Sequence, residues 1–177
     1  TIFYPNKGRE RIKAMIETRP DWCVSRQRVW GVPLPIFVHK KTKEILVDDQ
    51  VNENIASIYE KEGSDCWFSD NPQRFLGEKY KAEDYDKLSD IVEVWFDSGC
   101  THTFVLEKRK DLNWPASMYL EGSDQHRGWF HSSLLESCGT RGRAPYESIL
   151  SHGFVVDGKG LKMSKSLGNV IAPDEIL

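Results

Sequence analysis

The stretch Met118-Tyr-Leu-Glu-Gly-Ser-Asp-Gln-His-Arg-Gly-Trp-Phe130 decides the fold class of this chain. It begins as a strand, and Phe130, Leu134 and Cys138 then recur at helical spacing. This order predicts a strand, a turn and a helix. Because ligands of open α/β sheets bind at the carboxyl ends of the strands, the residues that end this strand are candidates to contact one: Glu121, Gly122, Asp124 and Gln125.

The chemistry of this strand end suits a nucleotide or an amino acid. Carboxylates accept hydrogen bonds from ribose hydroxyls or from a substrate ammonium group, and Gly122 allows a backbone to approach closely. A polar strand end is also common where nothing binds. A further apolar stretch, Ser148–Val156, predicts the last strand and contains His152-Gly153. A histidine there can equally be a structural residue.

The segment Gly153–Asn169 predicts a loop that handles phosphate. Asp157-Gly158 is a hairpin-turn signal that follows two β-branched valines. After the turn come two lysines, with a methionine and a serine between them and a second serine after them: Lys162, Met163, Ser164, Lys165 and Ser166. Two cations and two hydroxyls so close together suit a polyanion. Lysines after a turn can also be no more than solvated surface charge.

The run Ile91–Gly99 is almost continuously apolar and ends in Asp-Ser-Gly. It predicts a buried parallel strand that delivers its last side chains to a site. In such a strand Trp95 and Asp97 would share one face. The tryptophan could be a core residue or the wall of a pocket.

The first ninety residues show weaker signals. Residues 7–19 predict an amphipathic helix that ends at Pro20. Four side chains of residues 21–36 crowd together and predict either a stacked packing cluster or a functional element: Trp22, Arg26, Arg28 and Trp30. The more polar region 37–89 predicts a small insertion, with a hairpin at 36–47 and a helix at 51–61.

Composition narrows the class of protein. The 177 residues are 39% hydrophobic and 29% charged, as in a soluble globular protein. The net charge of -3 provides no overall positive field that would attract nucleic acid. No apolar run approaches the roughly 18 to 20 residues of a membrane span, so a cytoplasmic location is expected. The four cysteines are far apart and predict buried free thiols and no metal site. The chain opens on Thr1 and its last residues resemble the first turn of a helix, which predicts a piece of a longer polypeptide.

The residue sequence of this loop also resembles that of a known protein family. Residues 162–166 are, letter for letter, the KMSKS signature of class I aminoacyl-tRNA synthetases. The stretches 21–36, 91–99 and 118–130 resemble the same family, and match its isoleucine-specific branch in the bacterial form best. The resemblance spans essentially the whole chain.

The resemblance implies a role for each candidate residue. Lys162 and Lys165 would be catalytic, with Met163, Ser164 and Ser166 in the ATP loop. Trp95 and Trp129 would wall the amino-acid pocket. The aminoacyl-adenylate would be contacted by the remaining candidates: Asp97, Glu121, Gly122, Asp124, Gln125, His152 and Gly153. ATP with Mg²⁺ would be the substrate complex, isoleucine and tRNA(Ile) the other partners, and the full-length protein a monomer with no protein-bound metal in this segment.

The implied fold class is α/β, the second half of a Rossmann-like parallel-sheet catalytic domain with a small inserted subdomain. Residues 1–36 would end an editing-domain insertion and return into the core, 37–89 would be a small connective insertion, and 90–177 would carry the KMSKS loop. The other signature of the class, His-x-Gly-His, is absent, so the chain alone is expected to be inactive. A leucyl- or valyl-type enzyme, or a non-catalytic nucleotide- or RNA-binding module, are the alternatives.

Overall fold

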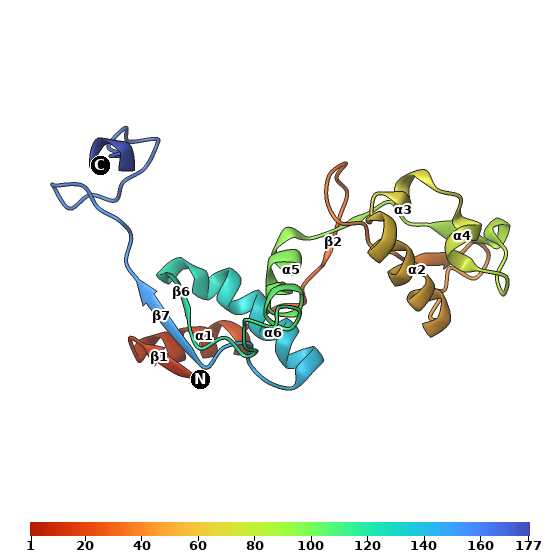
Figure 1. The fold of residues 1–177 in the computed structure, drawn as a ribbon, viewed down its shortest axis with the longest axis horizontal. Coiled ribbons are helices and arrows are strands. Elements are labelled where there is room, and N and C mark those ends of the chain that lie inside the picture. The colour runs from red at the N-terminus through yellow and green to blue at the C-terminus, as the bar shows by residue number, and fades with distance from the viewer. The chain divides into compact units, whose positions relative to one another are not determined.

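The computed structural model describes residues 1–177 and forms two compact units. The first unit comprises residues 1–20 and 98–177, and the second comprises residues 21–97. Figure 1 shows the helices and strands of both. The first unit is therefore formed by two segments of the chain, because the second unit is inserted between them in the sequence.

A three-stranded parallel sheet forms the centre of the first unit. Its strands are β1 (Ile2–Tyr4), β6 (Tyr119–Gly122) and β7 (Ser148–His152), and they lie in the order β1-β7-β6 (Figure 1). A 3₁₀ helix, η3 (Ser123–Arg127), and helix α6 (Trp129–Arg141) follow β6 directly. The predicted strand, turn and helix are confirmed, and the chain has a mixed α/β fold with a parallel sheet.

One face of this sheet is covered by helices. The register aligns Phe3, Ile149 and Tyr119 in one row across the three strands, and all three are buried. They pack with Ile12 of helix α1 (Lys7–Glu17) and Phe130 of α6. This contact explains why the predicted helix at 7–19 forms, because most helical stability in proteins comes from burying an apolar face.

The other face of the sheet is open. The next row in the register is Tyr4, Leu150 and Leu120. Side chains alternate between the faces of a strand, so this row points away from the helices. The exposed fractions of Tyr4 and Leu120 are 50% and 56%. The sheet therefore presents apolar side chains to solvent on this side.

The last strand is shorter than the sequence predicts. Strand β7 ends at His152, opposite Gly122, because β6 turns into η3 at that point and offers no further backbone partner. The chain then forms an irregular hairpin with a bridge between Val156 and Lys162. The predicted turn at Asp157-Gly158 is confirmed at its tip, where the Gly160 amide donates to the Asp157 carbonyl.

The remaining elements of the first unit are short. A π-helix, η2 (His102–Leu106), precedes β6, and a 3₁₀ helix, η4 (Pro173–Glu175), lies near the C-terminal end. Helix α6 ends where Gly142 adopts a left-handed conformation with φ of 71°. Glycine is favoured there because it has no Cβ to crowd the preceding carbonyl.

The second unit contains two small antiparallel pairs and three helices. Strand β2 (Ser25–Arg26) pairs with β5 (Ile91–Val92), and β3 (Phe37–His39) pairs with β4 (Tyr85–Lys87). The helices are α2 (Asp49–Glu62), α3 (Cys66–Ser69) and α4 (Pro72–Leu76), with a 3₁₀ turn, η1, at Ala82–Asp84. The predicted helix at 51–61 is confirmed. The predicted hairpin at 36–47 forms as a bridge between Val38 and Ile45.

Trp67 is the centre of the core of this unit. Its side chain is fully buried, its ring lies 5.1 Å from that of Phe37 and 4.9 Å from that of Phe75, and its Nε1 donates to the Leu88 carbonyl at 2.7 Å. The indole therefore buries a large apolar surface and still satisfies its one donor. Trp67 thereby connects the core of the second unit to the backbone at Leu88.

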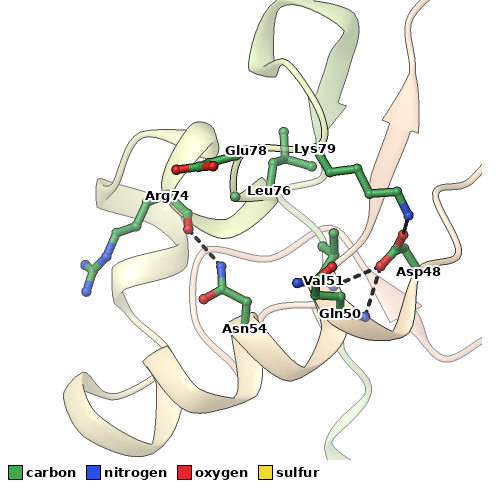
Figure 2. Close-up of a pocket in the computed structure, with 9 residues that line it drawn as sticks. Asp48, Gln50, Val51, Asn54, Arg74, Leu76, Glu78 and Lys79 are labelled. Atoms are coloured by element: carbon green, nitrogen blue, oxygen red, sulfur yellow. Dashed lines mark hydrogen bonds and ion pairs between the residues drawn. The ribbon is translucent and has the colours of Figure 1, made fainter.

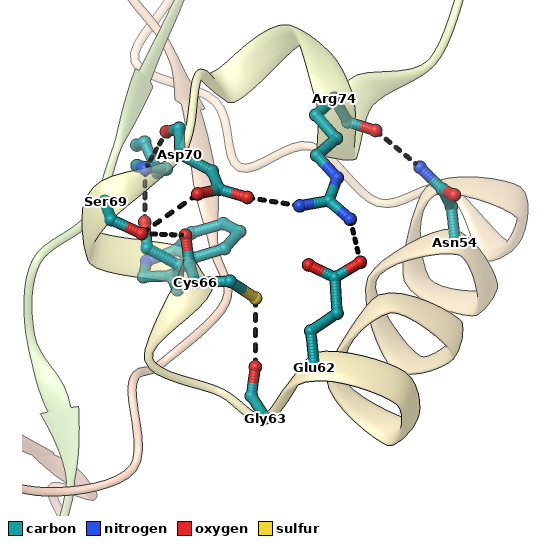
Figure 3. Close-up of polar contacts among 9 residues, drawn as sticks. Asn54, Glu62, Gly63, Cys66, Ser69, Asp70 and Arg74 are labelled. Atoms are coloured by element: carbon teal, nitrogen blue, oxygen red, sulfur yellow. Dashed lines mark hydrogen bonds and ion pairs between the residues drawn. The ribbon is translucent and has the colours of Figure 1, made fainter.

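Charged side chains fix the helices of the second unit. The Asp48 carboxylate caps α2 by accepting from the backbone amides of Gln50 and Val51, and it also pairs with Lys79 (Figure 2). Arg74 pairs with Glu62 and Asp70, so it links α2, α4 and the end of α3 (Figure 3). The Lys79 pair holds the carboxyl pKa of Asp48 below its ordinary range, and the Arg74 pair does the same for Glu62. Hydrogen bonds from Ser69 and then from Arg74 lower the pKa of Asp70.

The prediction of a parallel strand at 91–99 is wrong. Only Ile91 and Val92 are extended, and their partner β2 is antiparallel; residues 94–99 form helix α5 (Val94–Gly99). The Glu93 carboxylate accepts from the Trp95 amide at 3.1 Å, and the Glu93 carbonyl accepts from the Phe96 amide at 2.8 Å. Glu93 therefore caps the helix, and this local bonding ends the strand.

Two other expectations are wrong. The cysteines are free but not buried, since Cys23 and Cys138 are exposed and the other two are partly exposed. The stacked cluster of Arg and Trp at 21–36 does not form either. Trp22 instead packs against Phe96, Arg26 donates to carbonyls of its own loop, and Trp30 is 88% exposed.

Candidate active site

The carboxyl ends of β6 and β7 bring two predicted site segments together. Gly122 lies opposite His152 in the parallel register, and Glu121 lies opposite Ser151. Glu121, Asp124 and His152 are exposed at this edge. The edge is the position at which open α/β sheets bind ligands, so the sheet places the candidate polar groups where such a site is expected.

Gly122 lets a carboxylate lie against the backbone at this edge. A Cβ atom on Gly122 would be 2.5 Å from Asp124 Oδ1 and 3.9 Å from His152 Cε1. The backbone angles of Gly122 are φ -63° and ψ 155°, which any residue can adopt. An alanine at this position would therefore displace the Asp124 carboxylate, although the backbone conformation would accept it.

Gln125 and Trp129 are tied into the start of α6. Gln125 Oε1 accepts from the Trp129 amide at 2.9 Å, and Gln125 Nε2 donates to Asp124 Oδ2 at 3.2 Å. The glutamine thus caps one of the free amides of the helix and holds the Asp124 carboxylate. Sequence reasoning assigned Gln125 to a ligand and did not identify this structural role.

The Trp129 side chain is fixed on two sides. Its ring stacks on Tyr119 with centroids 4.0 Å apart and an interplanar angle of 6°, and its Nε1 donates to the Ser98 carbonyl at 2.9 Å. A tryptophan held in this way is rigid, and the ring is only half-buried. It can therefore present a preformed apolar surface.

Trp95 and Asp97 lie in α5 and do not share a face. Residues two apart in an α-helix point in nearly opposite directions, whereas the predicted strand would have aligned them. Trp95 is 43% exposed. Burial raises the pKa of the Asp97 carboxyl, and the Glu93 carboxylate raises it further.

The loop after β7 is held by side chains that sequence reasoning did not single out. Asn169 Nδ2 donates to Asp157 Oδ2 at 2.9 Å, and Asn169 Oδ1 accepts from the Ser164 amide at 3.0 Å. Asp157 Oδ1 accepts from the amides of Lys159 and Leu161, each at 2.9 Å. These hydrogen bonds hold the pKa of Asp157 below its ordinary range, the one from Asn169 most of all.

The side chains of the two loop lysines have different surroundings. Lys162 Nζ lies 3.6 Å from the centroid of the Phe154 ring, a cation–π contact. Lys165 is exposed, and its Nζ makes no ion pair or hydrogen bond. Ser164 Oγ and Ser166 Oγ are 3.2 Å apart, and Met163 is half-buried. The loop thus offers at least one cation that can take an anionic partner without breaking an existing contact.

A cavity of about 650 Å³ lies elsewhere, in the second unit (Figure 2). It is lined by residues of α2 and of the chain around α4, and by none of the predicted site residues. No three His, Cys, Asp or Glu side chains are grouped so that they could hold a metal ion. None of the helices has the length and apolar character needed to cross a membrane.

Comparison with known proteins first concerns the fold. The structure resembles that of LeuRS from Agrobacterium radiobacter, solved in a ternary complex with tRNA and LeuAMS. The TM-score is 0.59 with 22% sequence identity, over 92% of this chain and 24% of that one. The chain therefore shares the fold of part of that protein.

The sequence gives the family. All residues, 1–177, match the family described as tRNA synthetases class I (I, L, M and V), and the chain belongs to this family. It is 92% identical over 177 residues to the isoleucine--tRNA ligase of Pelagibacter ubique. It is also 57% identical over 175 residues to that of Zymomonas mobilis and 58% identical over 178 to that of Brucella melitensis.

The matched region is a small part of each relative. It covers 100% of this chain and 20% of the Pelagibacter protein, 99% and 19% for Zymomonas, and 100% and 18% for Brucella. The chain thus spans about a fifth of the length of the curated relatives it matches.

Proposed function

We propose that this chain is part of an isoleucyl-tRNA synthetase of the bacterial type. The enzyme would join isoleucine and ATP into isoleucyl-adenylate and pyrophosphate, and then transfer the isoleucyl group to tRNA(Ile). The observation that carries the proposal is the 92% identity over the whole chain with a relative named isoleucine--tRNA ligase. The family alone leaves several amino acids open, and the shared name of three relatives favours isoleucine over leucine or valine.

In this proposal residues 90–177 belong to the second half of a Rossmann-like catalytic domain. Support comes from the parallel order β1-β7-β6 and from the lysine-bearing loop that follows β7. Residues 1–36 would end an editing-domain insertion and return into the core, and residues 37–89 would be a small connective insertion. The compact unit at 21–97 contains the proposed connective insertion and the stretches on either side of it.

The reaction needs no protein nucleophile. A carboxylate oxygen of isoleucine forms a bond to the α-phosphorus of ATP, the bond to the bridging oxygen breaks, and pyrophosphate leaves. Catalysis then consists of alignment and of charge stabilisation on the phosphates. We assign the second task to Lys162 and Lys165 of the KMSKS loop, with Met163, Ser164 and Ser166 shaping it. The unpaired Nζ of Lys165 supports this assignment.

The substrates would bind beside this loop. Glu121, Gly122, Asp124 and Gln125 would contact the adenylate from β6, and His152-Gly153 would contact the adenine from β7. The adjacency of Gly122 and His152 supports one shared site for both segments. Trp129 would wall the isoleucine side chain, and its rigid half-buried ring supports a wall that discriminates by shape. The resemblance assigns Trp95 to the same pocket and Asp97 to the adenylate.

The proposed partners are isoleucine, tRNA(Ile) and ATP, with Mg²⁺ arriving as part of the ATP substrate complex. We further propose a monomeric full-length enzyme in the cytoplasm. Amino-acid-dependent exchange of pyrophosphate into ATP by the complete enzyme tests the function. Isoleucine should support exchange far better than leucine or valine. A preference for leucine or valine would identify the related enzyme instead, and no exchange with any of the three would indicate a non-catalytic module.

A further inference from the structure

One side chain ties together the separate parts of the loop that follows β7. Asn169 Nδ2 donates to Asp157 Oδ2 at 2.9 Å and to the Lys162 carbonyl at 3.3 Å. Its Oδ1 accepts from the Ser164 amide at 3.0 Å. The amide of Asn169 therefore uses both its donor and its acceptor groups, and a carboxylate at the same position could not do so.

The partner Asp157 organises the tip of the hairpin. Its Oδ1 accepts from the amides of Lys159 and Leu161, each at 2.9 Å, and its Oδ2 faces Asn169. Both oxygens are thus directed toward the interior of the loop. The only carboxylate within residues 153–169 is therefore satisfied by N–H donors, which leaves the lysines to define the charge of its outer surface.

The backbone that carries Lys165 is a tight turn anchored at the same place. The Leu167 amide donates to Ser164 Oγ at 3.3 Å, and the Gly168 amide donates to the Ser164 carbonyl at 3.2 Å. Gly168 has a φ of 65°, in the left-handed region that glycine adopts at little cost. Because Ser164 begins this turn and its amide is bound by Asn169, displacement of Asn169 would release the turn.

We infer that Asp157 and Asn169 form a clasp that positions the two loop lysines, and that both are positioning residues for the reaction. The inference rests on the function proposed above, since it assigns the lysines to the phosphates of ATP. The clasp fixes the backbone at Lys162 and Ser164 and leaves the Lys165 side chain exposed. A preordered loop loses less conformational entropy when it engages a substrate than an open one does.

A reciprocal exchange of the two residues in the complete enzyme tests the clasp. Asn169→Asp alone places two carboxylates opposite each other, and Asp157→Asn alone forces an amide group toward either the Asn169 amide or the tip amides. The double variant restores one donor facing one acceptor and keeps an acceptor for the Ser164 amide; it loses only the donation to the Lys162 carbonyl, which at 3.3 Å is the longest of the three Asn169 contacts. Each single variant should lower kcat for isoleucine-dependent pyrophosphate exchange about tenfold, with the isoleucine KM unchanged, and the double variant should return to within about threefold of the parent.

A second measurement is independent of catalysis. Trypsin cleavage after Lys162 and Lys165, followed by mass spectrometry in the substrate-free enzyme, should be about tenfold faster in each single variant and near the parent rate in the double variant. Single variants that match the parent in both cleavage and exchange would overturn the clasp. Failure of the double variant to restore either quantity would also overturn it.

A background without either loop lysine separates this inference from the proposed function. If Asn169 acts through the lysines, adding Asn169→Asp to the combined Lys162→Ala and Lys165→Ala variant should lower exchange by less than about twofold further. A full additional tenfold loss would overturn the positioning role. If Lys165→Ala itself leaves exchange unchanged, the proposed role of the lysines fails, while the trypsin measurement still decides whether the clasp exists.

Discussion

The indole ring of Trp129 lies flat on the phenol ring of Tyr119, with centroids 4.0 Å apart. Tyr119 is buried in β6, and Trp129 begins α6, so the stack joins the strand to the helix that follows it. The same tryptophan is the proposed wall for the isoleucine side chain. One residue would therefore serve both stability and selectivity.

Two variants separate these roles. Trp129→Phe keeps an aromatic stack and loses the bond to the Ser98 carbonyl, whereas Trp129→Ala loses both. We expect Trp129→Ala to destabilise the first unit by about 2 to 3 kcal/mol and Trp129→Phe by about 1 kcal/mol. In exchange kinetics of the complete enzyme, Trp129→Ala should raise the KM for isoleucine far more than that for ATP. Equal losses for both substrates would indicate a core tryptophan only.

Gly122→Ala should affect binding without affecting stability. The added Cβ would lie 2.5 Å from Asp124 Oδ1 and must displace that carboxylate, yet the backbone angles suit alanine. We expect unfolding free energy to change by less than about 1 kcal/mol, and affinity for a non-hydrolysable isoleucyl-adenylate analogue to fall about tenfold because a contact is misplaced. Calorimetry on the complete enzyme measures the second quantity. Unchanged affinity would remove Asp124 from the adenylate site.

The 177-residue chain on its own should not activate isoleucine. No His-x-Gly-His block is present, and Tyr4 and Leu120 leave one sheet face apolar and open. We expect no isoleucine-dependent exchange and a tendency to self-associate, which Leu120→Lys should reduce because a charge on that face opposes contact. Sedimentation velocity beside the exchange assay measures both. Exchange above background that Lys165→Ala abolishes would contradict this expectation.

We expect His131 to make the first unit less stable against unfolding in mild acid. Burial lowers the pKa of His131 from its ordinary value of 6.5, and its Nε2 lies 3.2 Å from Arg19 Nη1. The unfolded chain therefore takes up a proton near pH 6.5 that the folded chain refuses, and stability is lost as pH falls below that value. In the complete enzyme, hydrogen exchange of α6 amides, corrected for intrinsic rates, should quicken between pH 7 and 5.5 more in the parent than in His131→Gln. Identical pH dependence in both would exclude His131 as the cause.

Local patterns predict the strands and helices that bury one regular face. Helices α1 and α2 bury residues spaced about 3.6 apart, as their sequences predict. Helix α6 forms where Phe130, Leu134 and Cys138 recur at that spacing, although Cys138 is exposed. The run 91–99 fails because a short apolar segment fits a strand or a buried helix equally well. The Glu93 carboxylate decides between them by capping the Trp95 amide, which is a bond that no periodicity reveals.

The candidate site also has features that the sequence predicts and features that it does not. The positions of Gly122 and His152 at one sheet edge follow from the order of strand and turn, since parallel strands end together. The clasp does not follow, because Asp157 and Asn169 are 12 residues apart in an irregular loop where spacing does not define a partner. Nor does the capping role of Gln125, which depends on where α6 begins.

The central claim is that the loop lysines stabilise the transferring phosphates of an isoleucine-activating enzyme. Lys165→Ala in the complete enzyme should lower isoleucine-dependent pyrophosphate exchange by about a hundredfold or more, as for loss of one preorganised donor. Lys159→Ala, which removes a lysine from the same hairpin but outside the signature, should stay within about twofold of the parent because general loop charge contributes little. Exchange by Lys165→Ala within about threefold of the parent, or equal losses in the two variants, would contradict the claim.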